Sequence, residues 1–125
     1  MKANVVLIVA SLLSLLFMIV HLTQDTINQA DGSMTYPVPV VFLALWLYAT
    51  LMAPDRIWGH VMMLLGGLFS VGMIVVHAKG IVVSHSGGFF FVWTQFALST
   101  TGWLTILLAA RGLVMAVRAR RAAPR

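Results

Sequence analysis

Long apolar stretches alternate with short polar segments along the whole chain. Four stretches contain no Asp, Glu, Lys or Arg, and they lie between the charged residues at 2 and 25, 31 and 55, 56 and 79, and 79 and 111. Each is longer than the roughly 20 apolar residues that a helix needs to cross a bilayer. The pattern predicts an all-α integral membrane protein with four transmembrane helices, over about residues 4–22, 37–53, 57–77 and 89–110.

The links between these spans predict how the helices are arranged. Pro54, Asp55 and Arg56 form a tight turn between the second and third spans, which requires these two helices to be antiparallel. Short polar links join the other spans, so we expect two antiparallel hairpins in a compact bundle. Residues 1–110 then form one transmembrane domain, followed by a basic tail over residues 111–125.

Basic residues are unequally divided between the two predicted sides of the membrane. Lys2, Arg56 and five arginines of the tail lie on one side, whereas Lys79 alone lies on the other. Because cytoplasmic loops carry the excess of Lys and Arg, both termini are expected in the cytoplasm, with the protein in the plasma membrane or bacterial inner membrane. The tail is expected to contact anionic lipid. Topology also accounts for the pI of about 10.9, so we expect no nucleic-acid partner.

Composition excludes several classes of site. The chain is 61% hydrophobic and has no cysteine, which excludes disulfides, thiolate metal sites and a cysteine nucleophile. It contains no Gly-rich phosphate loop, GxSxG turn or HExxH helix. All three acidic residues are expected in loops, which disfavours a carrier driven by an intramembrane carboxylate.

Small and weakly polar side chains recur at intervals of three and four residues in the first and third spans. This spacing places them on one face of each helix, where small residues let membrane helices approach closely. We expect the two faces to meet. They consist of Ser11, Ser14, Met18, His21 and Asp25 in the first span, and Gly59, Met63, Gly66, Ser70, Met73 and His77 in the third.

Three of the four histidines fall at the predicted outer end of the bundle, with Asp25 one helical turn beyond the first of them. Imidazole binds zinc, copper and iron, a carboxylate adds an oxygen ligand, and a thioether favours Cu(I). Two histidines on facing helices could instead hold a haem iron. The candidate ligands are His21, His77, His85, Asp25, Met18 and Met73. The same histidines are also compatible with side chains that only lie among lipid headgroups. A further alternative is a proton relay, because histidine titrates close to the pH of the cell exterior.

Two further polar residues lie within the predicted spans. His60 is expected to be an interfacial histidine whose ring nitrogens are satisfied, or else to contact Asp55 across the turn. Gln95 lies in the middle of the fourth span, where its amide needs a hydrogen bond to another helix. The alternative for Gln95 is that it lines a polar cavity.

Three functions fit these observations. The first is a non-catalytic accessory or assembly component, acting as a homo-oligomer or bound to a larger membrane protein. The second is an outward-facing protein that binds copper, zinc or haem through His21 and His77 and takes part in redox chemistry or metal handling. The third is a small channel or carrier, which only Gln95 and the nearby hydroxyl groups favour.

Overall fold

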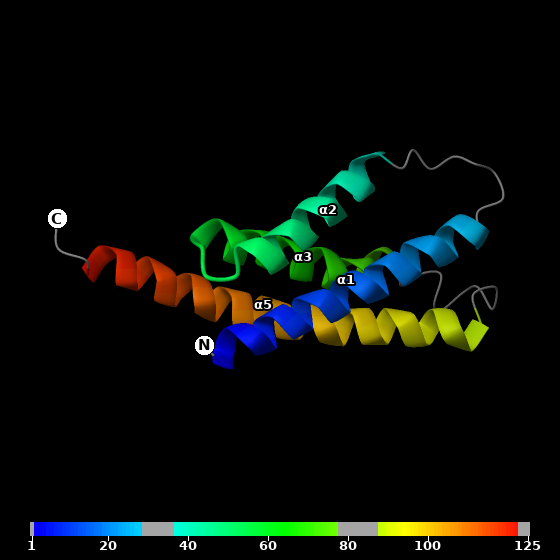
Figure 1. Ribbon diagram of the computed structural model, residues 1–125. Coiled ribbons are helices and arrows are strands. Elements are labelled where there is room, and N and C mark those ends of the chain that lie inside the picture. The colour runs from blue at the N-terminus through cyan, green and yellow to red at the C-terminus, as the bar shows by residue number, and fades with distance from the viewer. Residues whose placement is uncertain (1, 29–36, 78–87, 123–125) are drawn as a thin grey trace.

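The computed structural model describes residues 2–28, 37–77 and 88–122 of the chain. This part is all-helical and contains four helices (Figure 1): α1 (Lys2–Asn28), α2 (Pro37–Met52), α3 (Ile57–Val76) and α5 (Gly88–Ala122). Successive helices run in opposite directions. The start of α1, the turn between α2 and α3 and the end of α5 therefore lie at one end of the bundle, which we call the His60 end. The opposite end, where α3 finishes, is the His77 end.

Three of the helices are long and apolar enough to cross a membrane. The spans that meet this criterion are Asn4–Thr26, Ile57–Val76 and Phe89–Ala122. Large apolar side chains such as Val76 and Leu107 are exposed on their outer faces, as expected for surfaces that contact lipid. The described part of the chain is thus all-helical, as the sequence predicted, and three of its helices could span a membrane.

The helix α2 differs from the other three in length. It occupies most of the predicted second span, but its 16 residues rise only about 24 Å, less than the hydrocarbon thickness of about 30 Å. Its apolar part, Val40–Met52, is shorter still. The structure therefore supports three spans by length and leaves α2 as a shorter apolar helix packed beside them.

Two helices extend beyond their predicted ends. The helix α1 continues past residue 22 to Asn28, because no Gly or Pro interrupts it and the hydroxyl of Thr23 bonds back to the carbonyl oxygen of Ile19 at 2.8 Å. The expectation that all acids lie in loops was therefore wrong for Asp25, which is helical. The helix α5 likewise carries the predicted fourth span and most of the basic tail in one continuous element.

Packing is organised around α5. Its largest interface is with α3, and its next largest is with α1. Small residues make this approach close, since a Cβ atom on Gly67 would lie 2.9 Å from the carbonyl oxygen of Gly102. Most residues of the two predicted polar faces are buried, but α1 and α3 each contact α5 more than they contact one another.

The side chain of Trp46 joins α2 to the rest of the core. It is fully buried, and its indole Nε1 donates a 2.8 Å hydrogen bond to the hydroxyl of Ser11 on α1. The same hydroxyl lies 2.8 Å from that of Thr50. The indole ring packs against Gly66 of α3, where a Cβ atom would come within 2.2 Å of it. One aromatic side chain thus fixes the position of α2 against both α1 and α3.

Candidate metal centre

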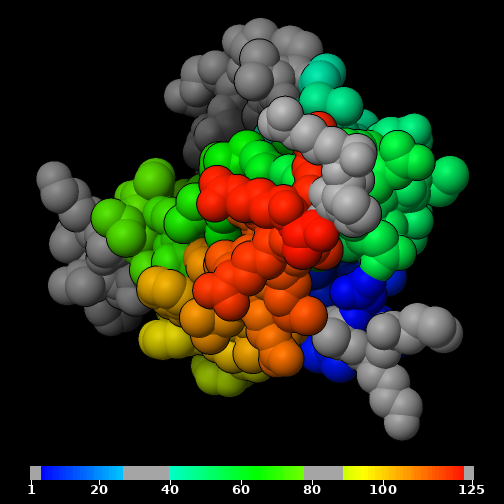
Figure 2. All heavy atoms as spheres, turned by 90° about the vertical axis from the view of Figure 1, so that its left-hand side faces the viewer, coloured from blue at the N-terminus to red at the C-terminus, as the bar shows by residue number. Residues whose placement is uncertain are grey.

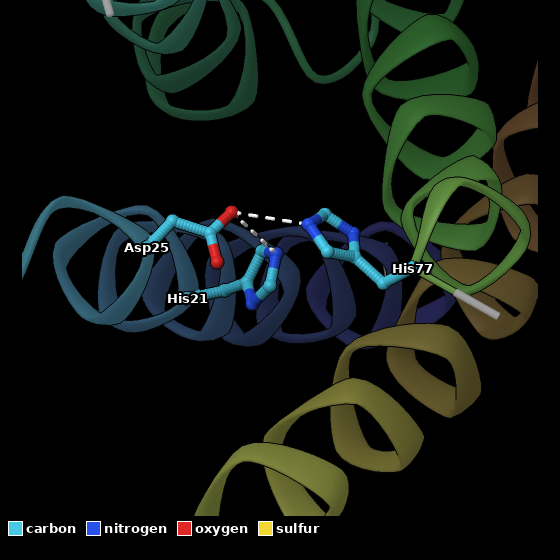
Figure 3. Close-up of side chains that lie close together, drawn as sticks. All are labelled: His21, Asp25 and His77. Carbon is cyan, nitrogen blue, oxygen red and sulfur yellow. Dashed lines mark ion pairs between the residues drawn. The ribbon is translucent and has the colours of Figure 1, made fainter. Parts of the chain in front are cut away.

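Three ionisable side chains meet at the His77 end of the bundle (Figure 3). His21 and Asp25 come from successive turns of α1, and His77 directly follows the last residue of α3. The Oδ2 atom of Asp25 lies 3.3 Å from Nε2 of His21 and 3.2 Å from Nε2 of His77. His21 is fully buried and Asp25 is 6% exposed, so this carboxylate faces the two imidazoles in a largely dry environment.

The helices hold these three side chains in place by ordinary helical geometry. Residues four apart lie on the same helix face, which brings Asp25 beside His21. The backbone N–H of His77 donates to the carbonyl oxygen of Met73 at 3.0 Å, and its ring Nδ1 lies 3.0 Å from the same oxygen. The His77 ring is therefore held against the last turn of α3, with Nε2 directed at Asp25.

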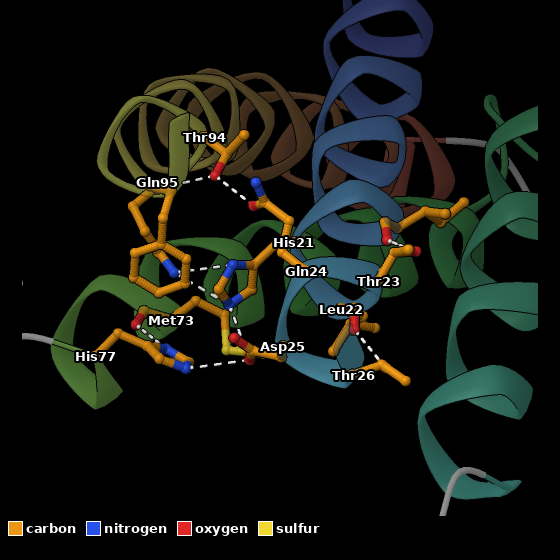
Figure 4. A network of polar contacts seen from close by, with 12 residues as sticks. His21, Leu22, Thr23, Gln24, Asp25, Thr26, Met73, His77, Thr94 and Gln95 are labelled. Carbon is orange, nitrogen blue, oxygen red and sulfur yellow. Dashed lines mark hydrogen bonds and ion pairs between the residues drawn. The ribbon is translucent and has the colours of Figure 1, made fainter. Parts of the chain in front are cut away.

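A third helix contributes Gln95, which contacts His21 (Figure 4). Its amide Nε2 lies 3.0 Å from each ring nitrogen of His21, and its Oε1 is buried without a partner in the described part of the chain. The two atoms of a side-chain amide are assigned by their hydrogen bonds. Turning the Gln95 amide places Oε1 at this position, close to both ring nitrogens of His21, where it would accept an N–H from the ring.

The protonation of His77 has a direct consequence for the cluster. Its Nδ1 faces a carbonyl oxygen, which can only accept, so Nδ1 must be the protonated nitrogen. In neutral imidazole, Nε2 then carries a lone pair and can only accept a hydrogen bond. It faces an oxygen of Asp25 that is also an acceptor. Two acceptors at 3.2 Å repel one another unless a cation lies between them. The contact therefore requires a proton, on Nε2 or on the Asp25 carboxyl, or a metal ion.

The three potential ligand atoms are gathered closely enough to approach one metal ion. One atom from each of His21, Asp25 and His77 lies within 4.8 Å of the others. Ligands at about 2.0–2.2 Å from a tetrahedral zinc ion stand about 3.3–3.6 Å apart. The two nitrogen-to-oxygen distances, 3.2 and 3.3 Å, lie at the short end of that range. The arrangement supplies three ligands and leaves a fourth position for water or another donor.

Aromatic packing around the two imidazoles bears on the haem alternative. The rings of His21 and His77 are in edge-to-face contact, with centroids 4.7 Å apart, and Phe91 packs against both. The axial ligands of a haem iron lie on opposite sides of a porphyrin. Rings in direct contact leave no space for a porphyrin between them, so this geometry favours a single ion.

The remaining predicted ligands are placed differently. Met73 is partly buried and extends from α3 toward the cluster, where its thioether could add a soft ligand (Figure 4). Met18 is fully buried one turn before His21 on the same side of α1. His85 lies outside the described residues. Gln95 was predicted to bond to another helix or to line a polar cavity, and the contact with α1 confirms the first prediction. That its partner is His21 is the feature of the site that sequence reasoning missed.

Gln95 also belongs to a wider polar contact between α1 and α5. The neighbouring Thr94 donates to the side-chain oxygen of Gln24 at 2.9 Å and lies 2.8 Å from the carbonyl oxygen of Phe91. Both Thr94 and Gln95 are fully buried. These contacts fix α5 beside the turn of α1 that carries His21 and Asp25.

Comparison with known proteins identifies no relative. No protein-family model, curated protein or solved structure matches the chain. The function must therefore be argued from the site itself.

Proposed function

We propose that this protein is an integral membrane protein that binds one transition-metal ion through His21, Asp25 and His77. The observation that carries the proposal is the convergence of two Nε2 atoms on one buried carboxylate oxygen, at 3.3 and 3.2 Å. Buried ionisable groups in a membrane helix are costly and are usually retained for function. A metal ion would satisfy all three groups at once.

The donor set indicates which metals to test. Two imidazole nitrogens and a carboxylate suit zinc, Cu(II) and Fe(II), while the thioether of Met73 would favour Cu(I). Gln95 would act as a positioning residue that orients the ring of His21, as hydrogen-bonded partners of metal-binding histidines do. The open fourth position would allow the ion to be exchanged or to bind a further ligand, which fits metal handling or redox chemistry.

The proposal includes a membrane topology. We place four spans in the plasma or inner membrane with both termini in the cytoplasm, on the basis of the basic residues at the His60 end. A span as short as α2 is accommodated when the bilayer thins around it, or when the side chains that flank it reach the interface. In this orientation the metal centre faces the outside of the cell. The proposal also covers an accessory or oligomeric membrane protein in which the metal ion has a structural role, because that role requires the same three ligands.

The decisive experiment is elemental analysis for iron, copper and zinc on protein purified in mild detergent without a His tag. We expect about one metal ion per chain in the wild type, and loss of the ion in His21→Ala, His77→Ala and Asp25→Asn. His60→Phe is the matched control, since it removes a buried histidine at the other end of the bundle. Circular dichroism and gel filtration would show that each variant is folded.

The outcomes separate the three functions. Metal lost only in the cluster variants supports the proposal, and the element found chooses between copper, zinc and iron. Equal metal content in wild type and cluster variants would reject these ligands. A folded wild type without metal would favour the accessory function. Co-purification of a partner and the oligomeric state would then test that function.

A further inference from the structure

A cavity of about 360 Å³ lies at the His60 end, away from the metal centre. It is enclosed by the start of α1, the turn before α3 and the C-terminal part of α5, the elements that face the viewer in Figure 2. Most of its wall is apolar. The polar side chains that line it are Asn4, Asp55, His60 and Arg111.

His60 is the most constrained of these polar groups. It is 3% exposed, and its Nδ1 atom has no hydrogen-bond partner among the described residues. Its ring lies against the backbone of Gly112, where a Cβ atom would come within 2.5 Å of Cε1. The expectation that His60 is satisfied at the interface was therefore wrong. The Nδ1 atom is covered by α5 at Gly112, so a molecule in the cavity would meet another part of the His60 ring.

Asp55 and Arg111 place opposite charges on the same cavity. Asp55 accepts a hydrogen bond from the amide of Asn4. Within the described ranges the ion pairs are the two that Asp25 makes, so Asp55 and Arg111 line one cavity without pairing with each other. Both side chains are exposed at its rim. A ligand with separated positive and negative groups would complement them.

We infer that this cavity binds the headgroup of a zwitterionic phospholipid that carries a primary ammonium group. Arg111 would bind the phosphodiester, because guanidinium donors match phosphate oxygens, and Asp55 would accept from the ammonium. The ring of His60 would form part of the wall against which the headgroup packs. Leu7, Leu108 and Met115 would contact the first part of an acyl chain. This site is independent of the proposed metal centre.

The position of the cavity along the bundle supports this choice of ligand. Arg111 follows the apolar part of α5, where the sequence changes to a basic segment that ends with Arg120 and Arg121 in the last helical turn. In the proposed topology, lipid headgroups would lie at the level of Arg111. A ligand that is apolar at one end and doubly charged at the other therefore matches both the walls and the rim of the cavity.

Native mass spectrometry of the full-length protein in mild detergent tests the inference. Phosphatidylethanolamine, phosphatidylcholine and phosphatidylglycerol of identical acyl chains would be titrated separately, and inorganic phosphate added as a competitor. We expect phosphatidylethanolamine to bind about tenfold more tightly than the other two, since each lost charge-assisted hydrogen bond corresponds to roughly a tenfold change. Phosphatidylcholine lacks ammonium N–H groups and phosphatidylglycerol lacks the positive charge.

Matched variants identify the groups responsible. Arg111→Gln should weaken binding of phosphatidylethanolamine about tenfold, whereas Arg118→Gln, two turns later on the same helix and outside the cavity lining, should change it little. Asp55→Asn should abolish the preference over phosphatidylcholine. His60→Phe keeps an aromatic ring in the cavity wall, so it should change binding of the three lipids little.

Four outcomes would overturn the inference. They are equal affinity for the three lipids, tightest binding of phosphatidylglycerol, equal losses in Arg111→Gln and Arg118→Gln, and displacement of lipid by low millimolar phosphate. The first means no headgroup site, and the second and third mean diffuse attraction to the basic helix. The fourth means a site for free phosphate. Metal content should be unchanged in all four variants, so failure here is distinguishable from failure of the metal proposal.

Discussion

The side-chain amide of Gln95 on α5 lies 3.0 Å from Nδ1 of His21 on α1, and both residues are fully buried. This contact joins the helix at the centre of the packing to the helix that supplies two of the three cluster residues. The same amide nitrogen lies 3.0 Å from Nε2 of His21, and that Nε2 also faces Asp25 at 3.3 Å. Under our proposal, Gln95 therefore acts on the orientation of the whole His21 ring.

Replacing Gln95 by Leu should weaken metal binding without removing a ligand. Groups that hydrogen-bond a metal-binding histidine typically raise its metal affinity about 10- to 100-fold. The metal dissociation constant of Gln95→Leu should therefore exceed that of the wild type by about that factor. A competitive chelator titration measures it. Ser99→Ala, one turn further along α5, is the control, and equal affinities for wild type and Gln95→Leu would show that the amide does not position the ring.

Bound metal should stabilise the folded protein. At a free metal concentration one hundred times the dissociation constant, linkage predicts about 2.7 kcal/mol of added stability. Unfolding by SDS in mixed micelles, with and without chelator, measures this difference. The double variant His21→Ala/His77→Ala should show no dependence on chelator. A persistent dependence in that variant would place the stabilising metal elsewhere.

Two glycines on α3 should respond in opposite ways to the same substitution. A Cβ atom on Gly66 would meet the Trp46 ring at 2.2 Å, whereas one on Gly72 meets nothing within 4 Å. Gly66→Ala should therefore lower the free energy of unfolding by about 1–3 kcal/mol through overpacking. Gly72→Ala should be neutral or stabilising by up to about 1 kcal/mol, because alanine favours the helix. SDS titrations of the two variants give the comparison.

The hydrogen bond between Trp46 and Ser11 should appear as a coupling energy. We expect Trp46→Phe and Ser11→Ala each to destabilise the protein and the double variant to lose less than the sum. The expected coupling is about 0.6–2 kcal/mol, the range for side-chain hydrogen bonds between membrane helices. Additive losses would mean that packing of the indole, and not its N–H, holds α2 in place.

The topology is open to cysteine labelling, because the natural chain contains no cysteine. A single cysteine at Arg118→Cys should react with a membrane-impermeant maleimide only after the cells are opened. One at Ser86→Cys, in the predicted link on the other side, should react in intact cells. The reverse pattern would invert the orientation and place the metal centre in the cytoplasm.

Much of the fold follows from periodicity, and the cluster follows only in part. Charge-free stretches located all four helices, and the four-residue spacing of His21 and Asp25 correctly placed both on one face of α1. For Asp25 and His77, the sequence predicted only that both lie at the same end of the bundle. Whether they contact each other depends on how far α1 and α3 are shifted along one another. A hydrophobic pattern identifies the buried face of each helix. The shift of one helix along another is determined by packing, which the pattern does not record.

Two residues show where sequence reasoning stops. Gln95 was known to need a partner, but the pattern could not say which helix would supply it. His60 follows a glycine at the start of a span and resembles an ordinary interfacial histidine, yet the close approach of Gly112 buries it. Burial of that kind arises from contact between segments far apart in the chain, which single-helix patterns do not record.

The cluster residues come from α1 and from the end of α3, with Gln95 of α5 beside them, and this has a consequence for how the protein is made. Helices enter the membrane in chain order, so α1 carries His21 and Asp25 into the bilayer before α3 brings His77 and α5 brings Gln95. Until those partners are in place, the charged carboxylate of Asp25 needs contact with water. Under our proposal, metal loading is therefore a late maturation step, and a nascent chain stopped before α3 would reach the membrane in a form unable to acquire its ion.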